Sequence, residues 1–132
     1  MEQADFNNVV DAFNDNAALY LGIMPNIDEV KFGYSYINSK FTLYCQATDR
    51  SIKELKKRVL NNKSIHFIKW AKNGNIIQGD GIVIILETKE ERGNGINYIL
   101  KHYKEKNELN INDIDNLFLF KIEVNNACRY KQ

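Results

Sequence analysis

The sequence predicts a mainly β, α+β fold, in which six antiparallel strands are accompanied by short flanking helices. Six segments of the chain have the alternating or continuously apolar pattern that is typical of strands. Most of these segments are separated by short turn sequences, as in β-hairpins. The helices do not alternate with the strands in the way that builds a parallel sheet. Closing six strands into a small barrel would remove their exposed edges, so we expect a barrel.

Length and composition limit the broad class of the protein. The chain has 132 residues, which fits one domain, and we therefore treat residues 1–132 as a single domain. Hydrophobic residues make up 44% of the chain and charged residues 27%, which suits a folded core and not a disordered chain. The net charge of +1 gives no argument for nucleic acid or a membrane as a partner. No apolar run approaches the ~18 residues of a membrane-spanning helix.

The cysteines and the N-terminus predict a reducing, cytoplasmic compartment. The two cysteines, Cys45 and Cys128, are too few for a disulfide framework and have no C-x-x-C spacing. The first residues, Met1–Asp5, are polar and acidic and do not have the pattern of a signal peptide.

The strands are predicted from their patterns of apolar residues. Ala17–Met24 is almost continuously apolar, which predicts a buried strand. In Val30–Ile37 one face carries valine and aromatic residues, and the other face is more polar. The six predicted strands are Ala17–Met24, Val30–Ile37, Phe41–Gln46, Ser64–Trp70, Ile76–Leu86 and Leu117–Asn125.

Turn residues punctuate these strands. Pro25–Asp28 predicts a turn, and Asn38–Lys40 and Lys72–Asn75 predict hairpin connections. The Gly79–Gly81 segment inside a strand predicts a bulge or a close approach of two backbones. We expect the chain from Asn126 onward to be loose.

Two helices flank the predicted barrel. Asp5–Asn14 has apolar residues at helical spacing, and its first residue is suited to cap the helix. Lys89–Lys106 is predicted to be helical in its second half only, because Gly93 and Gly95 weaken the first half. The polar segment 107–116 is expected to be a connection.

A third helix, Ser51–Leu60, begins with a sequence that has the form of a capping box. In this motif the Ser51 hydroxyl accepts the backbone N–H of Glu54, and the Glu54 carboxylate reaches back to the N–H of Ser51. Four apolar residues are predicted to share one face of the helix: Ile52, Leu55, Val59 and Leu60.

The charges at the start of this helix are unusual. A helix N-terminus carries a partial positive charge and normally attracts acidic residues, but here Arg50 and Lys53 flank it, with Asp49 and Glu54 opposing them. Two cations beside free N–H groups make a suitable site for a phosphate. The alternative is that both cations point into water, since exposed charges at helix ends cost little.

The order of these parts, from Ala17 to Leu86, resembles the pyridoxamine 5'-phosphate oxidase-like, FMN-binding split-barrel family. That family has a turn with proline, a hairpin, a phosphate-binding turn, a short helix and a later strand with a central glycine. The Tyr44-Cys45-Gln46 strand end followed by Lys53 is similar to the family's "Y-F-H/T-x…K" pattern. The corresponding parts are Leu19–Met24, Pro25, Val30–Ile37, Asn38–Lys40, Phe41–Gln46, Asp49–Lys53, Leu55–Asn62, Ile65–Trp70, Gly74 and Gly81.

The resemblance implies a six-stranded split barrel that forms a homodimer and binds FMN between its subunits. It implies that Arg50, Ser51 and Lys53 hold the FMN phosphate, and that Lys31 supplies a second basic group. It also implies that five residues line the isoalloxazine, partly through backbone groups, and that two reach the flavin of the partner subunit. The five are Phe32, Gly33, Tyr44, Cys45 and Gln46, and the two are Trp70 and Gln78.

The chain also departs from the family pattern. Gln46 stands where histidine or threonine is common, and Asn61-Asn62 replaces the family's "NP" after the helix. The arginine-rich C-terminal motif of the true pyridoxamine phosphate oxidases is absent, so vitamin B6 oxidation is not predicted. The stress-protein, flavin-reductase and nitroimidazole-resistance-like branches are better neighbours.

Other candidate sites have simpler explanations. His66 and His102 lack metal-ligand spacing, so no metal is predicted. Cys45 has no indicated base and is expected to be a small buried residue and not a nucleophile. The aromatic residues Phe32, Tyr34, Tyr36, Phe41 and Tyr44 are expected to be core rather than to stack on a ligand.

The sequence therefore predicts an FMN-dependent oxidoreductase that acts on a small planar substrate, with NAD(P)H as a possible reductant. The cofactor would carry the chemistry, so no catalytic side chain is predicted. Two alternatives stay open. One is a non-catalytic flavin- or haem-binding protein on the same scaffold. The other is a nucleic-acid-binding β-barrel, which the net charge of +1 disfavours.

Overall fold

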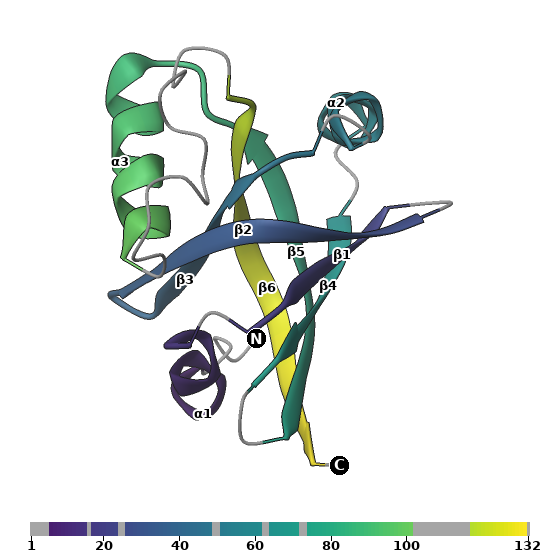
Figure 1. Cartoon of the computed structure of the whole chain (residues 1–132), viewed down its shortest axis with the longest axis vertical. Coiled ribbons are helices and arrows are strands. Elements are labelled where there is room, and N and C mark those ends of the chain that lie inside the picture. The colour runs from purple at the N-terminus through teal and green to yellow at the C-terminus, as the bar shows by residue number, and fades with distance from the viewer. Residues whose placement is uncertain are drawn as a thin grey trace.

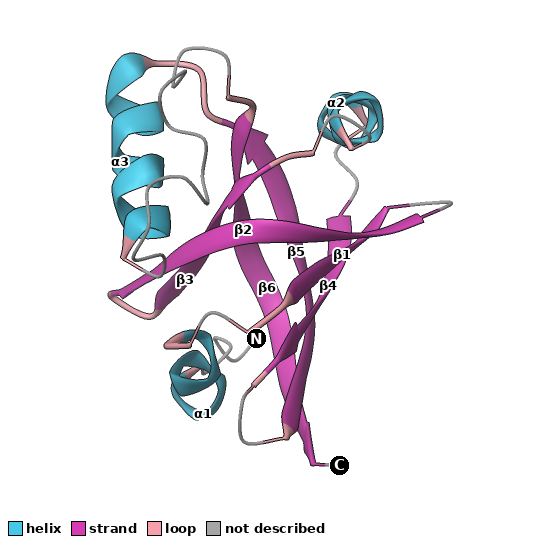
Figure 2. Ribbon diagram, viewed as in Figure 1, coloured by secondary structure: helices cyan, strands magenta, loops and turns pink. Residues whose placement is uncertain are grey.

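Six antiparallel strands close into a barrel, as predicted (Figures 1 and 2). The computed structural model describes residues 6–15, 17–23, 26–48, 51–61, 64–71, 74–101 and 117–131. The strand order around the barrel is β1-β2-β3-β6-β5-β4, and β4 pairs with β1 to close it. The strands are β1 (Leu19–Ile23), β2 (Asn26–Ile37), β3 (Lys40–Gln46), β4 (Ser64–Trp70), β5 (Asn75–Ile85) and β6 (Leu119–Lys131).

The barrel interior is filled by alternate residues of the strands. On β3 and β4, every second residue is buried, which confirms the alternation read from the sequence. The ring of Phe13 contacts the rings of Phe32, Phe41 and Phe67 with centroids 5.0–6.2 Å apart. Phe32 and Phe41 therefore belong to the core, as expected. Tyr34 packs against it from a partly exposed position.

Both predicted hairpins are present, and the β2–β3 turn has the expected geometry. Asn38 and Ser39 have φ values of 54° and 65°, and two successive positive φ angles suit the twist of a two-residue β2–β3 turn. Gly74 has a φ of +89° between β4 and β5. The turn predicted at Pro25–Asp28 was wrong in part, because Asn26–Asp28 already belong to β2 and pair with β1.

The predicted bulge on β5 is confirmed. The register between β5 and β6 shifts between Asp80 and Gly81. A Cβ atom at Gly79 would lie 2.4 Å from the Asn126 carbonyl oxygen, and one at Gly81 would lie 2.4 Å from the Glu123 carbonyl oxygen. The two backbones therefore approach so closely here that only glycine fits.

Three helical segments flank the barrel in the part of the chain that the structure describes, as many as were predicted. α1 (Asn7–Val10) continues as a 3₁₀ turn, η1 (Asp11–Phe13), and is shorter than the predicted helix. α2 is Ile52–Leu60, and α3 is Lys89–Leu100. None of the helices in the described part of the chain has the length and hydropathy needed to cross a lipid bilayer.

α3 covers the outer face of β2, β3 and β6 and makes a second small core there (Figure 1). It is helical from its first residue, where Thr88 accepts the N–H of Glu91 at 3.1 Å, so the prediction of a broken first half was wrong. Gly95 is buried against Leu86 and not a defect in the helix. The predicted continuation beyond Lys101, with the connection 107–116, lies outside the described residues.

β6 is longer than predicted. Its residues from Asn126 to Lys131, expected to be loose, pair with β5 as far as Asn75. Arg129 on this extension donates from Nε to the Asn8 carbonyl oxygen at 3.0 Å and pairs with the Asp11 carboxylate. The end of β6 therefore contacts the N-terminal helical segment.

β1 is shorter and less buried than expected, since Leu19 and Leu21 face the core while Tyr20 and Gly22 are partly exposed. Lys69 occupies an inward position on β4 and is fully buried. Its Nζ lies 2.7 Å from Asp15 Oδ1 and 2.6 Å from the Trp70 carbonyl oxygen. This ion pair holds the end of the N-terminal segment against the barrel.

Candidate functional site

The start of α2 is the first candidate site, and its geometry differs from the predicted capping box. Ser51 does not cap the helix: its side chain is fully buried and its hydroxyl donates to the Asp28 carboxylate. The Ser51 N–H donates to the Thr48 carbonyl oxygen at 3.0 Å. Glu54 lies 4.0 Å from Arg58 in place of reaching back to Ser51. The predicted capping box was wrong: Ser51 has helical backbone angles and makes no cap hydrogen bond, and its side chain is held in the interior by Asp28, far away in the sequence.

The backbone donors in the first turn of α2 have no acceptor among the residues that the structure describes. The first helical hydrogen bond runs from the N–H of Leu55 to the Ser51 carbonyl oxygen at 3.0 Å. Among the described residues, no partner accepts the N–H groups of Ile52, Lys53 and Glu54. The Lys53 side chain is exposed beside them. This set of donors fits a phosphate group. Arg50, the other predicted phosphate ligand, lies outside the described residues.

The rest of α2 closes one end of the barrel. Leu55 is fully buried in the main core, and Val59 packs against it. Leu60 was predicted to share this face, but it is 84% exposed because it lies at the end of the helix, beyond the barrel rim. The exposed Lys56 and Lys57 complete a basic outer surface on this helix.

The residues predicted to line the flavin ring lie on two adjacent strands. Lys31 and Gln46 face each other directly across β2 and β3. Phe32 and Cys45 form the next pair, and both side chains are fully buried in the core, so a ligand would meet their backbone groups only. Burial raises the pKa of the Cys45 thiol, which suits a structural role and not a nucleophile.

α3 lies directly over the next pair of residues, Gly33 and Tyr44. A Cβ atom at Gly33 would lie 2.2 Å from the carbonyl group of Tyr98, so the helix backbone rests on this glycine. The Tyr44 and Tyr98 rings stack with centroids 4.7 Å apart and planes 7° apart. On the side of this pair that leads to the start of α2, Lys31 is exposed and Gln46 is partly exposed.

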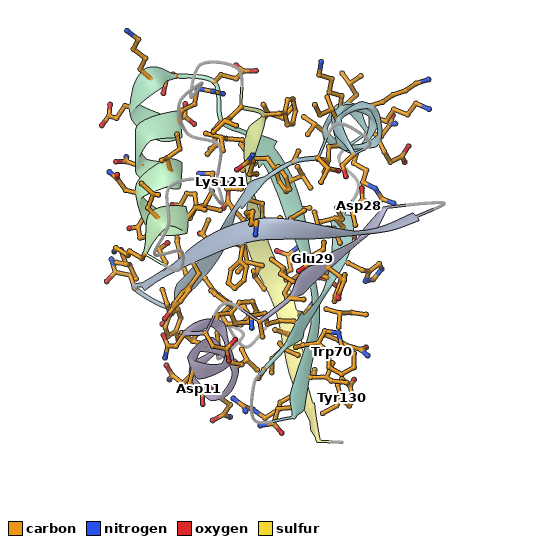
Figure 3. All side chains as sticks on the ribbon, viewed as in Figure 1. Asp11, Asp28, Glu29, Trp70, Lys121 and Tyr130 are labelled. Carbon is orange, nitrogen blue, oxygen red and sulfur yellow. The ribbon has the colours of Figure 1, made fainter. Side chains whose placement is uncertain are left out.

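Trp70 and Gln78 lie elsewhere, on the outer face of β4, β5 and β6. Trp70 is paired with Ile76, which is paired with Tyr130, and the next row on the same face contains Gln78 and Cys128. Trp70 is 38% exposed and Tyr130 is 51% exposed. Figure 3 shows these two side chains close together on the side of the barrel away from α3. Within one chain, Trp70 and Gln78 are therefore not part of the candidate site at the start of α2.

The structure contains a pocket that the sequence did not predict. It has a volume of about 610 Å³ and lies between the N-terminal helical segment, the second half of β2 and the end of α3. Its lining residues are Val10, Asn14, Tyr34, Ser35, Tyr36, Ile37, Tyr98 and Lys101. The sequence contains one local sign of this pocket, because Tyr98 and Lys101 are spaced i, i+3 at the end of α3. The other lining residues come from distant parts of the sequence.

Aromatic and charged groups meet in this pocket. The Lys101 ammonium lies 4.8 Å from the centroid of the Tyr98 ring. The Tyr34 hydroxyl donates to the side-chain oxygen of Asn14. Burial, and to a smaller extent the nearby Asp11 carboxylate, raises the pKa of Tyr34 above its usual value. The phenol therefore stays neutral at physiological pH.

No metal site is found among the described residues, where no three histidine, cysteine or acidic side chains cluster. His66 is exposed on β4, and His102 lies outside the described part of the chain.

Comparison with known proteins identifies the architecture. No protein-family model and no curated protein matches the chain in sequence. A solved structure of a candidate 5-nitroimidazole antibiotic resistance protein from Bacteroides thetaiotaomicron matches with a TM-score of 0.68, at 18% identity, over 95% of this chain and 82% of that one. The chain has the split-barrel fold.

Two further solved structures agree with this assignment. A NimC/NimA family protein from Clostridium acetobutylicum matches with a TM-score of 0.63, at 14% identity, over 96% of this chain and 87% of that one. A conserved hypothetical protein from Mycobacterium tuberculosis matches with a TM-score of 0.66, at 11% identity, over 99% of this chain and 90% of that one. These likenesses confirm the predicted resemblance to the pyridoxamine 5'-phosphate oxidase-like split barrels at the level of fold.

Proposed function

We propose that this split-barrel protein binds FMN and is an FMN-dependent oxidoreductase. The observation that carries the proposal is the start of α2, where Ser51 makes no side-chain cap and no described residue accepts the N–H groups of Ile52, Lys53 and Glu54. The exposed side chain of Lys53 lies on the same turn. Lys53 and Arg50 would hold the FMN phosphate there. Both donors of Ser51 are used within the protein, so its part in the site is to shape the turn.

The isoalloxazine would lie against the exposed surface around Lys31 and Gln46, with contacts to the backbone of Phe32 and Cys45. When bound, FMN supplies hydride or electron transfer, and the protein supplies binding, orientation and exclusion of water. A nicotinamide coenzyme is the proposed reductant, and the cytoplasm is the proposed compartment.

The tyrosine-lined pocket is the proposed place for the substrate. Tyr98 forms one wall of the pocket and also stacks on Tyr44, which was predicted to line the flavin. A small planar molecule would find flat aromatic surfaces there, together with the positive charge of Lys101. The name of the neighbour from Bacteroides, a candidate 5-nitroimidazole resistance protein, supports a small planar substrate.

The outer face of β4, β5 and β6 is the proposed homodimer interface. Trp70, Ile76 and Tyr130 form one cross-strand row on this face, and exposed aromatic residues are enriched at protein interfaces. In such a dimer, Trp70 and Gln78 would approach the flavin of the partner subunit. Trp70→Asp and Tyr130→Asp should each convert the dimer to a monomer in light scattering and should weaken FMN binding.

The central test is a fluorescence titration with FMN and, in parallel, with riboflavin, which lacks the phosphate. Arg50→Ala/Lys53→Ala should weaken FMN binding by several kcal/mol, since each charge-assisted contact is worth ~1.5–3 kcal/mol. Riboflavin affinity should be the same in both proteins.

The matched control is Lys56→Ala/Lys57→Ala, which removes two positive charges from the same helix without touching its first turn. This control should keep most of the FMN affinity. If the control loses as much affinity as Arg50→Ala/Lys53→Ala, the phosphate is not bound at the first turn. If the wild type binds no flavin, the proposed cofactor is wrong.

A non-catalytic flavin- or haem-binding protein would use the same scaffold. It would bind its cofactor and yet show no NAD(P)H-dependent reduction of a small acceptor. A nucleic-acid-binding barrel would instead show binding to a single-stranded oligonucleotide that falls steeply with salt.

A further inference from the structure

The tyrosine-lined pocket carries a charged side chain at one end only. It lies across the end of β2, with the N-terminal helical segment on one side and the end of α3 on the other (Figure 1). All eight lining residues belong to the described part of the chain, and among them only Lys101, from α3, is charged. The N-terminal segment contributes Val10 and Asn14, which are neutral. The pocket therefore has a positive end at α3 and a neutral end opposite it.

The Lys101 ammonium is held in place without being neutralised. It lies 4.8 Å from the centroid of the Tyr98 ring, which is itself part of the pocket wall. Among the described residues, no carboxylate forms an ion pair with Lys101, whereas the buried Lys69 is paired with Asp15 at 2.7 Å. A cation held on a ring face keeps its full charge, so it can still attract an anion.

The other ionisable groups near the pocket do not offset this charge. Burial, and then the Asp11 carboxylate, raises the pKa of Tyr34, so this phenol adds no negative charge at physiological pH. Its hydroxyl donates to the side-chain oxygen of Asn14. Asp11 itself is paired with the Arg129 guanidinium. The pocket therefore suits a negatively charged ligand better than a positively charged one.

The three tyrosine walls are held by other aromatic rings. Tyr98 stacks on Tyr44 with the two planes 7° apart. Tyr34 and Tyr36 both pack against the buried Phe41, with ring centroids 6.1 and 6.3 Å apart. Because these rings are already ordered, a ligand would lose little free energy in fixing them. Flat, rigid aromatic walls favour a flat aromatic ligand.

We propose that the pocket binds a planar aromatic molecule with a negative charge at one end, such as an aromatic carboxylate. The rings of Tyr34 and Tyr36 would contact the ligand ring, and Lys101 would attract its carboxylate. Ser35, which also lines the pocket, offers a neutral hydroxyl donor. This inference rests on the proposed function, because it gives the chemical class of the substrate that the pocket would hold.

Three probes that share one ring system and differ in charge test the electrostatic part of this inference. They are 2-naphthoate, the uncharged 2-naphthamide and the cationic 2-naphthylmethylamine. Binding to the full chain would be followed by NMR titration, with and without FMN. We expect 2-naphthoate to bind about fivefold more tightly than 2-naphthamide, as for one partly exposed charge pair, and the cation to bind most weakly. The amide signals of Tyr36 and Tyr98 should shift on binding.

Lysine variants identify the source of the charge preference. Lys101→Met should remove the preference for 2-naphthoate and leave the affinity for 2-naphthamide unchanged, whereas Lys101→Arg should keep the preference. The matched control is Lys89→Met, which removes an exposed lysine at the other end of α3. This control should bind all three probes like the wild type.

A saturated probe tests the requirement for a planar ring. Decalin-2-carboxylate has the same charge and a similar size, but its rings are not flat. It should bind more weakly than 2-naphthoate to both the wild type and Lys101→Met. Equal binding of the flat and saturated acids would overturn the aromatic part of the inference.

Other outcomes would reject the inference as a whole. These are no binding of 2-naphthoate at millimolar concentration, equal affinity for the three charged and uncharged probes, an anion preference that survives in Lys101→Met, or signal shifts away from the pocket. Failure of the proposed function looks different. If 2-naphthoate shows the expected preference but FMN does not bind, the cofactor is wrong and the pocket assignment stands. If FMN binds and the probes show no charge preference, this inference alone is rejected.

Discussion

At the scale of single residues, the buried charged side chains of Asp28 and Lys69 have identifiable partners. Asp28 is satisfied by two hydroxyls, and the fully buried Lys69 by the Asp15 carboxylate and a backbone carbonyl. The Lys69 ammonium also lies 5.4 Å from the centroid of the Phe32 ring and 5.9 Å from that of Phe13. Such groups are costly to bury, so removing one partner should have a larger effect than replacing both.

Lys69 and Asp15 allow a direct test of this asymmetry. Asp15→Ala should lower the free energy of unfolding by about 3 kcal/mol, because it leaves a buried ammonium without this carboxylate. Asp15→Ala/Lys69→Met should recover part of that loss, since methionine fills a similar volume without charge. Urea denaturation measures both values. A double variant less stable than Asp15→Ala would show that the buried charge is not the cause.

The two cysteines should differ sharply in reactivity. Burial raises the pKa of Cys45, so its thiol should stay protonated and unreactive in the native protein. Cys128 is exposed on β6 and should react quickly with a disulfide reagent at about pH 8. We expect one fast thiol per chain and a second only after unfolding. Cys128→Ser should remove the fast reaction; a remaining fast thiol would contradict the buried position of Cys45.

At the scale of elements, the position of α3 depends on one glycine. The carbonyl group of Tyr98 would meet a Cβ atom on Gly33 at 2.2 Å, and backbone cannot move aside as a flexible side chain can. This contact brings α3 close enough for Tyr98 to stack on Tyr44 and to form a wall of the pocket. The helix therefore links the candidate flavin surface to the candidate substrate pocket.

Gly33→Ala should lower the free energy of unfolding by about 2–3 kcal/mol, because the added methyl group forces α3 away from the barrel. The matched control is Gly93→Ala within α3, where a Cβ atom meets no atom within 4 Å. It should stabilise the protein by about 0.5–1 kcal/mol through higher helix propensity. Denaturation midpoints and the near-ultraviolet signal of the tyrosine pair measure the two effects. Equal and small effects would mean that α3 is not docked on Gly33.

At the scale of the whole molecule, closure of the barrel depends on β6, which lies between β3 and β5. Its second half also contacts the N-terminal segment through Arg129. One strand thus joins the two hairpins and fixes the helical segment that borders the pocket.

Truncation after Asn125 should therefore cost much more than the loss of a loose tail. It would remove the pairs that Asn126–Lys131 make with β5 and leave the edge of that strand exposed. We expect a large drop in melting temperature, or loss of cooperative unfolding, in a calorimetric scan. A truncation that removes Gln132 alone should melt like the full chain. An unchanged melting temperature after the longer truncation would contradict the extended β6.

The fold was predictable because its signals are local. Alternation of apolar residues, two hairpin turns and the glycines of the bulge each act within a few neighbouring residues. The second half of β6 was missed because it lacks a strong apolar alternation. Ala127 packs against the core, whereas Arg129 contacts Asn8 and Asp11 of the N-terminal segment. The capping box failed because the Ser51 side chain is held in the interior by a hydrogen bond to Asp28, which lies in a distant strand. The pocket was missed because three separate elements make it.

The strand order has a consequence for how the chain folds during synthesis. The β2–β3 and β4–β5 hairpins can form as soon as they emerge from the ribosome, because their partners are close in sequence. The barrel cannot close until residues 119–131 have also emerged. Until then, β3 and β5 each present an unpaired edge and an uncovered apolar face. A stalled nascent chain of this protein should therefore be a chaperone client, and it should lose that status when β6 is released.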